Sequence, residues 1–435
     1  MDAFQIAGGR PLAGEVDVAG AKNAALPIMA AAILADGPVR VGSVPDLIDV
    51  RTLLDLLSGL GVWARRNETG AVCLDNVDPS RVVADASLVQ QMRASFCVLG
   101  PLLARRGRAV VPLPGGCQIG DRPIDLHLRG LTALGAEIAV LGGHVIATAK
   151  RLTGATVMMS GPRGSTVTGT MNVLSAATLA HGETLIAGAA TEPEVVDLGK
   201  FLNTLGARIE GLGTSLIRVQ GVEHLGGGEH TIIPDRIEAA TLLIAAAITG
   251  GSATVRGARA DHMSAVLAAL AEMGVTIQVR GDSVTAIGAI RPRSIGLVAD
   301  PYPHLPTDVQ SQFTALASVA LGRSRIEDHV FPDRFAHVAE LNRMNARIRR
   351  SRNGAIVEGV GELCGGIVTA SDLRASAALV LAGLTASGST TVRHVHHLDR
   401  GYERLEAKLT QLGARITRVK DSSASEVHDS SFATA

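Results

Sequence analysis

A phrase of about seventy residues recurs six times along this chain of 435 residues. Each copy holds an apolar run with helical spacing, then Leu-Gly or a variant, then a segment that alternates apolar and polar residues. The glycine position of the phrase is filled, in order, by Gly61, Gly135, Gly206, Gly274, Asn345 and Gly413. The successive spacings are 74, 71, 68, 71 and 68 residues. A near-constant period of this length indicates internal duplication, so the chain must fold as six similar units.

The upstream half of each copy predicts how such a unit folds. Apolar runs such as LPIMAAAIL from Leu26 and LLIAAAI from Leu242 are apolar nearly all round, which predicts buried helices. Segments such as ATVRGA alternate at period two, which predicts strands. A glycine after the second helix suits a left-handed C-cap, and Asn345 is the next-best residue for that conformation. The pattern predicts an α/β protein, and three units per domain would give two similar lobes with a cleft between them.

The overall composition excludes several classes of function. Lysine plus arginine equals aspartate plus glutamate, 41 against 41, and 2% of residues are aromatic, so neither nucleic acid nor an anionic membrane is an expected partner. The four cysteines show no metal-ligand spacing and are typical of a reducing compartment. No apolar run reaches the roughly 18 residues that cross a bilayer. We therefore expect a cytoplasmic protein without a metal, a cofactor or an obligate protein partner, and a disordered tail over 420–435.

One glycine-rich segment, LPGGCQIGDRPIDLH from Leu113 to His127, places Cys117 in a shaped loop. A thiol beside the guanidinium of Arg122 is expected to have a lowered pKa and to be reactive. The alternative is a small apolar cysteine in a structural turn, and this segment alone does not decide between the two.

Cations stand at matching positions of the duplicated unit. Helix N-termini carry a partial positive charge and are anion sites. Cationic side chains at the predicted starts of buried helices add like charge to like, which indicates that an anionic partner binds there. The predicted starts carry Lys22-Asn23, Arg93, Thr170–Asn172, Asp235-Arg236 with Glu238, Thr307-Asp308 and Asp372–Arg374, and the other loops carry Cys117, Arg122, Arg334 and Arg400. We expect these cations to converge on a multiply charged anion, the alternative being scattered surface arginines.

These residues resemble the enolpyruvyl transferases, the family of UDP-N-acetylglucosamine 1-carboxyvinyltransferase and, more distantly, of 5-enolpyruvylshikimate-3-phosphate synthase. The resemblance runs from about Phe4 to Val419. It rests on GAKNAALP, MRAS, PGGCQIGDRPIDLH, EPEVVD, IPDRIEA, PYPHLPTDVQSQF, DRFAHVAELNRM, SDLRASA and HLDRGYERLE. It implies six βαβαββ repeats in two three-unit inside-out barrel lobes with an interlobe active site. The expected lobes are 22–233, which carries the cysteine loop, and 1–21 plus 234–419.

The resemblance also implies roles for individual residues. Phosphoenolpyruvate (PEP) would be bound through its phosphate by Lys22, Arg122 and Arg400, and through its carboxylate by Arg334 and Arg374. Cys117 would be the general acid at C3 of PEP, and Asp308 would take the proton of the acceptor hydroxyl. A helix N-cap is the alternative role for Asp308. The expected substrate-binding residues are Asn23, Arg93, Arg122, Pro123, Ile124, Asp125, Leu126, Arg163, Thr166, Val167, Val330, Arg334, Asp372 and Arg374.

The acceptor is where the sequence departs from its relatives. The segment from Pro123 to Leu126 matches the uridine-contacting segment of the family, whereas Thr166–Thr170 replaces the usual Ser-Val-Gly-Ala-Thr and follows a short insertion at 161–164. The first expectation is transfer to the 3-hydroxyl of UDP-N-acetylglucosamine, the committed step of peptidoglycan synthesis. The alternatives are transfer to the 3′-hydroxyl of UMP in nucleoside-antibiotic biosynthesis, and a non-catalytic sensor of uridine nucleotides.

Overall fold

The computed structural model describes residues 2–68, 70–115, 123–162 and 164–421. The chain is divided into two compact units. Unit 1 comprises Met1–Val18, Arg236–Asp300 and the residues from His304 onward, and unit 2 comprises Ala19–Asp235 with Pro301–Pro303. The chain therefore passes from one unit to the other near residues 18 and 235. The expected tail after residue 421 lies outside the described residues, and Lys420 pairs with Asp2 inside a sheet.

The described strands form six larger sheets, and five of these have four strands in one repeated arrangement. In each of the five, the first strand is parallel to the second, and two further strands follow antiparallel. The sixth sheet, β6-β8-β7, has Val83 paired in parallel with Val110 in place of the first strand. The predicted α/β class with six similar units is confirmed.

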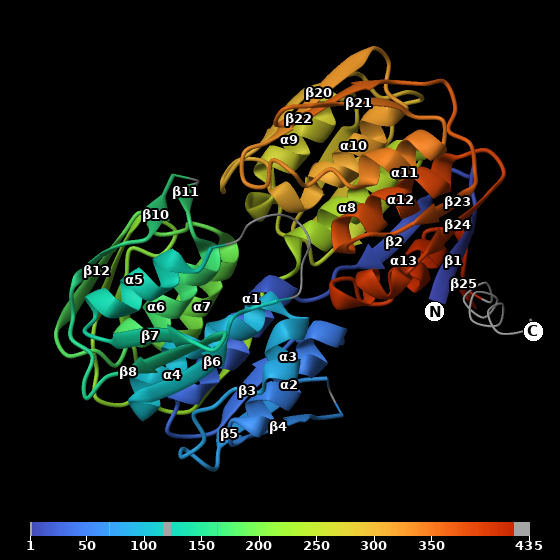
Figure 1. Cartoon of the computed structure of the whole chain (residues 1–435). Helices are drawn as coiled ribbons and strands as arrows, with labels where there is room; N and C mark the ends of the chain where they lie inside the picture. Colours follow the sequence, from blue (N-terminus) through green and yellow to red (C-terminus); the bar gives the residue numbers. More distant parts are fainter. Residues whose placement is uncertain (1, 69, 116–122, 163, 422–435) are drawn as a thin grey trace, which may run out of the picture. The chain divides into compact units, whose positions relative to one another are not determined.

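Unit 2 holds three of these repeats (Figure 1). The first repeat comprises β15 (Gly228–Thr231), α1 (Lys22–Ala31), η1 (Ala32–Leu34), β3 (Val39–Gly42), α2 (Ile48–Gly59), β4 (Val62–Arg66) and β5 (Val72–Asn76). The second comprises α3 (Ala86–Gln91), η2 (Arg93–Val98), α4 (Leu99–Arg106), β6 (Arg108–Pro112), α5 (Asp125–Ala133), β7 (Glu137–Leu141) and β8 (His144–Thr148). The third comprises β9 (Thr156–Met158), α6 (Val167–Ala177), β12 (Glu183–Ala187), α7 (Pro193–Thr204), β13 (Arg208–Glu210) and β14 (Leu216–Gln220).

Unit 1 holds the other three repeats. The fourth comprises β2 (Ala13–Asp17), α8 (Arg236–Ile248), β16 (Ser252–Arg256), η3 (Ala260–His262), α9 (Ser264–Glu272), β17 (Thr276–Arg280) and β18 (Ser283–Ile287). The fifth comprises β19 (Gly296–Ala299), η4 (Thr307–Val309), α10 (Gln310–Ser318), β20 (Arg323–Asp328), α11 (His337–Arg343), β21 (Arg347–Ser351) and β22 (Gly354–Glu358). The sixth comprises β23 (Ile367–Thr369), α12 (Leu373–Thr385), β24 (Ser389–Arg393), η5 (Val395–Arg400), α13 (Leu405–Gln411), β25 (Arg415–Lys420) and β1 (Asp2–Ala7).

Strands far apart in the sequence complete three of the sheets. The first strand of the chain, β1, pairs antiparallel with β24 and β25 and so closes the last repeat. The strand β2 lies parallel to β16, although the whole of unit 2 separates them in sequence. The strand β15 at the end of unit 2 lies parallel to β3 near its start. These three exchanges tie both ends of each unit into its sheets.

The glycine position of the recurring phrase has the predicted left-handed conformation in all six repeats. The backbone φ is 77° at Gly61, 94° at Gly135, 105° at Gly206, 91° at Gly274, 70° at Asn345 and 93° at Gly413. Two repeats share a further detail, because Asn203 and Asn342 each exchange two hydrogen bonds with the backbone of a residue six positions later, Ile209 and Ile348. The sequence repeat is therefore a structural repeat down to its turns.

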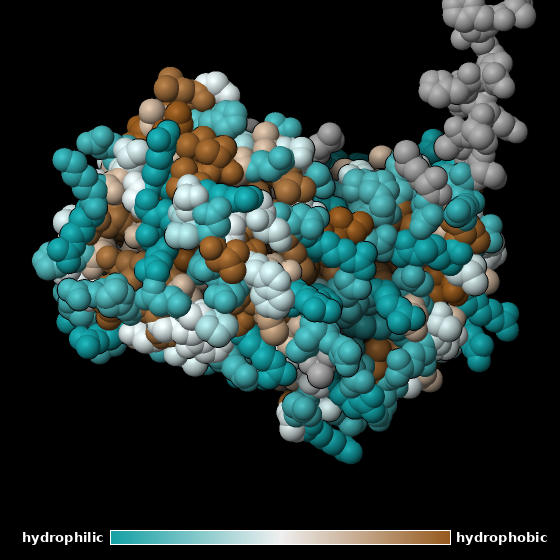
Figure 2. All heavy atoms as spheres, turned by 90° about the horizontal axis from the view of Figure 1, so that it is seen from below, coloured by the Kyte–Doolittle hydropathy of each residue, from teal (hydrophilic) through white to brown (hydrophobic). Residues whose placement is uncertain are grey.

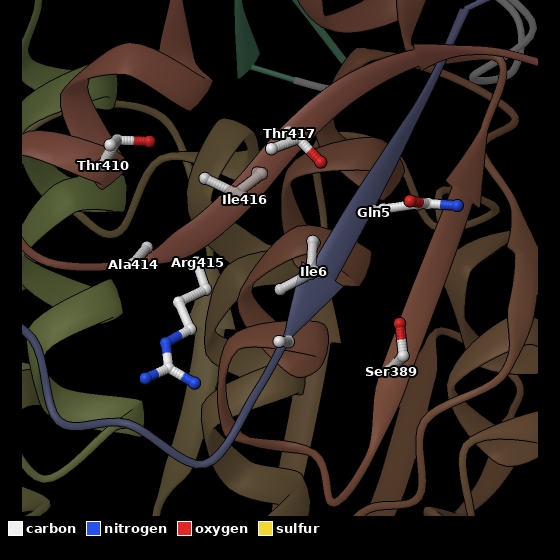
Figure 3. Close-up of a pocket in the computed structure, with 9 residues that line it drawn as sticks. Gln5, Ile6, Ser389, Thr410, Ala414, Arg415, Ile416 and Thr417 are labelled. Atoms are coloured by element: carbon white, nitrogen blue, oxygen red, sulfur yellow. The ribbon is translucent and has the colours of Figure 1, made fainter.

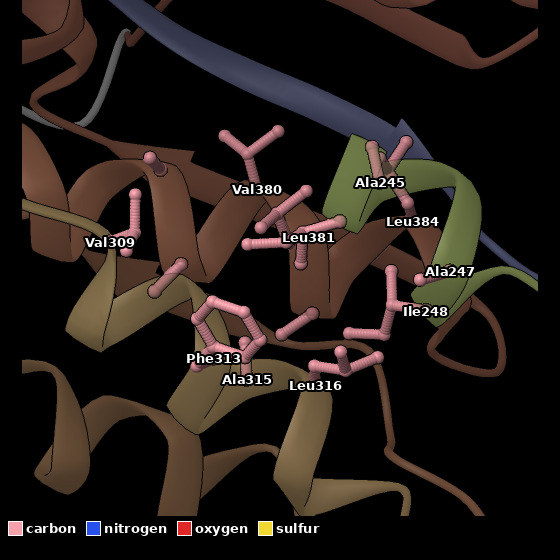
Figure 4. Close-up of a cluster of buried hydrophobic side chains, with 14 of the residues drawn as sticks. Ala245, Ala247, Ile248, Val309, Phe313, Ala315, Leu316, Val380, Leu381 and Leu384 are labelled. Atoms are coloured by element: carbon pink, nitrogen blue, oxygen red, sulfur yellow. The ribbon is translucent and has the colours of Figure 1, made fainter. Parts of the chain in front are cut away.

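The apolar helices lie inside each unit, as their composition predicts. Every residue of α8 is buried, and α8 packs with α10 and α12 at the centre of unit 1. Figure 4 shows Phe313 and Leu316 of α10 pointing toward apolar side chains of α12 and α8. In unit 2 the corresponding helices are α1, α4 and α6. The charged residues Lys22, Arg236 and Arg374 stand in the first turns of α1, α8 and α12.

The surface carries apolar side chains in small groups. Figure 2 shows one face on which apolar residues are interrupted by hydrophilic ones. Exposed large apolar side chains among the described residues include Trp63 and Ile290. No helix among the described residues is long and apolar enough to cross a membrane.

Candidate functional site

Asp308 is the centre of a charged cluster in unit 1. Arg334 Nη1 donates to Asp308 Oδ1 at 2.7 Å, and Arg374 Nη2 donates to Asp308 Oδ2 at 3.1 Å. The Arg334 and Arg374 side chains are 8% and 5% exposed, and that of Asp308 is 25% exposed. Three residues for which the sequence predicts separate roles thus form one ion-paired group. The alternative of an N-cap at Asp308 is wrong, because its carboxylate engages the two guanidinium groups.

The charge state of Asp308 follows from this pairing. Burial disfavours the charged carboxylate, but the positive charges of Arg374 and Arg334 outweigh it and hold the pKa of Asp308 below its ordinary value. The carboxylate is therefore ionised at neutral pH, and while it is paired it is a weak base.

A second carboxylate, that of Asp328, supports the cluster through a hydroxyl group. Thr307 Oγ1 accepts from Arg334 Nη1 at 3.2 Å and donates to Asp328 Oδ2 at 2.6 Å. Asp328 Oδ1 accepts from the backbone N–H groups of Val330 and Phe331 at 3.0 and 2.7 Å. Burial raises the pKa of Asp328. The predicted residue Val330 is thereby fixed next to the cluster by its backbone.

The start of α12 supplies two further predicted residues. Asp372 is the N-cap of α12, and its side chain accepts from the backbone N–H groups of Arg374 and Ala375 at 2.9 and 3.1 Å. Capping fixes the first turn of α12 and so the origin of the Arg374 side chain. Arg374 Cζ lies 5.3 Å from the centroid of the Tyr402 ring, a cation–π distance.

Arg400 ends η5, two residues before Tyr402. Its neighbour Asp399 is bound by both terminal nitrogens of Arg418, at 2.6 and 2.9 Å. Arg418 in β25 also donates to Glu406 at 3.1 Å, so the segment that carries Arg400 is held against the last sheet.

In unit 2 the predicted phosphate ligand Lys22 begins α1. Its Nζ lies 2.7 Å from Asp49 Oδ2, and the two side chains are 13% and 4% exposed. Asn23, the next residue, is exposed. Lys22 is thus held by a carboxylate of α2 for which the sequence assigns no role.

The segment from Pro123 to Leu126, for which the sequence predicts nucleotide binding, begins beside Arg93. Arg93 Nη2 donates to the Pro123 carbonyl oxygen at 3.5 Å, which brings two predicted residues together. Ile124 precedes α5, and Asp125 and Leu126 form the first positions of that helix. Cys117, Arg122 and Arg163, which the sequence also assigns to the site, lie outside the described residues.

His127, which follows that segment, is buried and neutral. Its Nδ1 lies 2.9 Å from Asn172 Nδ2, and its Nε2 lies 3.2 Å from Thr168 Oγ1. Because an amide nitrogen only donates, Nδ1 accepts and the ring proton is on Nε2. Burial, aided by the charge of Arg93, lowers the pKa of His127 to about 3. His127 therefore links α5 to α6 without carrying a charge.

The loop that departs from the family pattern folds as a small hairpin. The strands β10 (Ser160–Gly161) and β11 (Gly164–Ser165) pair antiparallel just before α6. Thr166 is the N-cap of α6, and its Oγ1 accepts from the Gly169 N–H at 3.2 Å. Thr170 and Asn172 are fully buried inside α6, so the prediction that they stand at the start of the helix is wrong. The helix begins at Val167, earlier than predicted, because polar residues that alternate with apolar ones precede the continuous apolar run and do not reveal where the helix starts.

A shallow pocket of about 460 Å³ lies elsewhere, on the sheet that contains β1, β24 and β25. Figure 3 shows its lining, which includes Gln5, Ile6, Ser389 and the charged side chain of Arg415. Of the predicted site residues that the structure describes, none lines this pocket.

Comparison with known proteins assigns the family. The family model described as EPSP synthase (3-phosphoshikimate 1-carboxyvinyltransferase) matches residues 6–409. The chain belongs to the EPSP synthase family. The protein is accordingly an enolpyruvyl transferase, as the motifs indicated. It is similar to the enolpyruvyl transferase NikO from Streptomyces tendae, with 28% identity, 97% of this chain and 99% of that chain covered, and a TM-score of 0.87. An EPSP synthase from Acinetobacter baumannii shares the fold at 21% identity, 97% and 100% coverage, and a TM-score of 0.74.

Three features of this enolpyruvyl transferase were not predicted. They are the Lys22–Asp49 pair, the His127–Asn172 contact, and a polar cluster around Gln312 in unit 1. Asp49 carried a signal in the sequence, because it is an acidic residue four positions before Leu53 and seven before Leu56, and so falls on the apolar, buried face of α2. Gln312 carried a weaker signal, because it is one of several polar residues at the start of α10, the helix that the sequence predicts to be buried.

Proposed function

We propose that this transferase moves the enolpyruvyl group of PEP to a sugar hydroxyl of a uridine nucleotide and releases phosphate. One observation supports the assignment of PEP most directly. Arg334 and Arg374 each donate a hydrogen bond to one oxygen of the Asp308 carboxylate, at 2.7 and 3.1 Å. Two guanidinium groups at this spacing are suited to the carboxylate of PEP.

In this proposal the substrate takes the place of Asp308. The carboxylate of PEP pairs with Arg334 and Arg374, and Asp308 loses the two cations that hold its pKa down. Because the positive charges favour the ionised form, their transfer to PEP raises the pKa of Asp308 and makes it a better base. Substrate binding and activation of the base are thus one event.

The reaction then proceeds in two steps. The acceptor oxygen bonds to C2 of PEP while Asp308 takes the hydroxyl proton and Cys117 gives a proton to C3, which forms a tetrahedral ketal. The Cys117 thiolate then takes a proton back from C3 while the bond from C2 to the phosphate oxygen breaks, which leaves the enolpyruvyl ether and inorganic phosphate. Lys22 and Arg400, with Arg122, stabilise the charge on the departing phosphate.

Two uridine nucleotides are candidate acceptors. The first is UDP-N-acetylglucosamine, modified at its 3-hydroxyl. The second is UMP, modified at its 3′-hydroxyl, and the β10–β11 hairpin favours it because this hairpin remodels the loop that in the related enzymes contacts the diphosphate. The Arg93 contact with Pro123 supports a uridine site in both cases.

The test is release of inorganic phosphate from PEP in the presence of each nucleotide. Release of phosphate with only one of the two nucleotides identifies that nucleotide as the acceptor. Release with neither nucleotide contradicts the proposed transfer and favours the non-catalytic sensor of uridine nucleotides. A third incubation with shikimate-3-phosphate tests the acceptor that the family model names.

The role proposed for Cys117 has its own test. Cys117→Ser is expected to lower turnover far more than nucleotide affinity, and fosfomycin, an epoxide that resembles PEP, is expected to inactivate the unmodified protein. Cys73→Ser is the matched control, because Cys73 is a half-buried thiol on β5. Equal losses of turnover and nucleotide affinity in Cys117→Ser would reduce the loop to a binding element.

A further inference from the structure

A cluster of buried polar side chains lies among the three central helices of unit 1. It consists of Thr241 in α8, Ser311 and Gln312 in α10, and Tyr402 after η5, and we refer to it as the Gln312 cluster. None of the four residues is more than 3% exposed. The surroundings are apolar, because α8, α10 and α12 bury alanine, leucine and isoleucine side chains around it.

The hydrogen bonds of the Gln312 cluster lead to the backbone of Asp308. Gln312 Nε2 donates to the Asp308 carbonyl oxygen at 2.9 Å and lies 3.1 Å from Thr241 Oγ1 and 3.2 Å from Tyr402 Oη. Thr241 gives its own proton to the Ile237 carbonyl oxygen at 2.8 Å, so Thr241 Oγ1 accepts from Tyr402 Oη at 2.9 Å. Each hydroxyl and amide proton thus has an acceptor.

The same cluster reaches Arg374 at two points. Ser311 Oγ lies 2.9 Å from the Arg374 carbonyl oxygen and 2.7 Å from Gln312 Oε1. The ring of Tyr402 lies 5.3 Å from Arg374 Cζ. The Asp308 carbonyl group is therefore connected to Arg374 through the Gln312 cluster. The cluster reaches the Arg374 carbonyl oxygen through Ser311 and the Arg374 guanidinium group through the Tyr402 ring.

A cluster of this kind is not required for packing. Burying an amide and hydroxyl groups among apolar side chains is unfavourable unless every group is paired, and apolar residues of equal volume fill such a space as well. What paired polar groups add is a fixed geometry. Here the fixed geometry is that of Asp308 and Arg374.

We infer that Gln312 and Tyr402 are positioning residues, which set the separation between the Asp308 carboxylate and the Arg374 guanidinium that the transfer reaction needs. The inference rests on the function proposed above for these two groups. Gln312 and Tyr402 are 0% and 1% exposed, so we expect neither to contact the substrate directly. Their effect passes through the carbonyl of Asp308, the carbonyl of Arg374 and the ring beneath its guanidinium.

The chain contains a matched control in the same helix. Gln310 is two residues before Gln312, is also 0% exposed, and donates from Nε2 to Thr314 Oγ1 at 3.2 Å. That hydrogen bond stays within α10 and leads away from Asp308 and Arg374. Gln312→Leu and Gln310→Leu each remove one buried amide from the first turn of α10, so the folded Gln310→Leu variant shows what the loss of a buried amide by itself does to kcat.

The experiment measures turnover, the affinity for PEP and the affinity for the nucleotide in the full-length variants. Gln312→Leu is expected to lower kcat by about 30- to 100-fold, since a misplacement of about 1 Å has effects of this size. It should also weaken PEP binding and leave nucleotide affinity unchanged. Gln310→Leu is expected to change kcat by less than about threefold. Tyr402→Phe keeps the ring and loses the hydroxyl, so we expect an intermediate decrease in kcat of about fivefold. If Gln312→Leu does not fold, the kcat of Tyr402→Phe tests the inference in its place.

Several results would overturn the inference. Equal kcat losses in the two leucine variants, or a Tyr402→Phe variant with full activity, mean that the cluster is only structural. A parallel loss of nucleotide affinity in Gln312→Leu means a general destabilisation. If the wild-type protein neither binds PEP nor releases phosphate from it, the proposed function is overturned and this inference with it. If the wild type is active but Gln312→Leu and Gln310→Leu lose equal kcat, only this inference is overturned.

Discussion

The two units share a scaffold and differ in the charges placed on it. In unit 1 a carboxylate contacts two guanidinium groups directly, so charges of both signs meet at Asp308. In unit 2 the central polar residue is the neutral His127, and the cation Lys22 is paired with the carboxylate of Asp49. The two units thus share their packing, but the described residues of unit 1 include a carboxylate held between two guanidinium groups, whereas those of unit 2 include a neutral histidine and a lysine–aspartate pair.

A shared structural device underlies this difference. An amide side chain from a central helix lies in the core of each unit: Asn172 of α6 bonds to the Phe96 carbonyl oxygen and the Gly100 N–H, and Gln312 of α10 bonds to the Asp308 carbonyl oxygen. Asn172 thus holds the segment from η2 into α4, and Gln312 holds η4, which directly precedes its own helix α10. The comparison predicts that the Asp308 carboxylate in unit 1 is needed for turnover, whereas the Asp49 carboxylate in unit 2 only restrains Lys22.

The largest effect is expected from Asp308→Asn. This variant loses the base, so turnover should fall by about a thousandfold. It also loses the carboxylate that occupies Arg334 and Arg374, so PEP alone should bind about tenfold more tightly in calorimetric titration. Asp328→Asn is the control, because it removes a neighbouring negative charge whose oxygens bond to Thr307 and to backbone N–H groups. A gain in PEP affinity of the same size in Asp328→Asn would mean a general charge effect.

The matching change in unit 2 is Asp49→Asn. Lys22 would lose its charged partner and be available to pair with the phosphate of PEP, so PEP affinity should rise by up to about fivefold. Turnover should persist, in contrast to Asp308→Asn. The free energy of unfolding should fall by about 1–3 kcal/mol because the pair is mostly buried. A collapse of turnover in a folded Asp49→Asn variant would contradict the division between the two units.

The smallest effect concerns acid stability, to which each unit contributes one buried histidine. Burial lowers the pKa of His127 in unit 2 and of His337 in unit 1 to about 3. The unfolded pKa is about 6.5, so each histidine takes up a proton on unfolding between about pH 6.5 and 3. The stabilisation is complete above about pH 6.5, and it is lost as the pH falls, by about 1.4 kcal/mol per pH unit for each residue.

Denaturant titrations between about pH 6 and 4.5 measure this loss. His127→Gln and His337→Gln should each reduce the pH dependence of the unfolding free energy by about one proton. An unchanged slope in either variant would show that the histidine in that unit is not held neutral.

Much of this fold was predictable from its period. The glycine positions indicated the six repeats, and the left-handed conformation at Gly61 and Asn345 followed from residue type. The exchanged strands β1, β2 and β15 were not predicted, because a strand of four to six residues does not reveal which distant strand it joins. Pairing between remote segments is decided by the packed units and not by local pattern.

The candidate site was predictable in its membership and not in its internal contacts. The sequence motifs named Asp308, Arg334 and Arg374, but as separate ligands and base. Their mutual pairing depends on three segments meeting in space, from η4, the loop before α11 and the start of α12. Gln312 was missed for the same reason, since a polar residue in an apolar helix gives no sign of which backbone carbonyl it will reach.

The most direct test of the central claim compares three acceptors in one assay of phosphate release from PEP. We expect release with UDP-N-acetylglucosamine or with UMP, slowed about a thousandfold in Asp308→Asn and retained in Asp49→Asn. Release with shikimate-3-phosphate and with neither uridine nucleotide would contradict it.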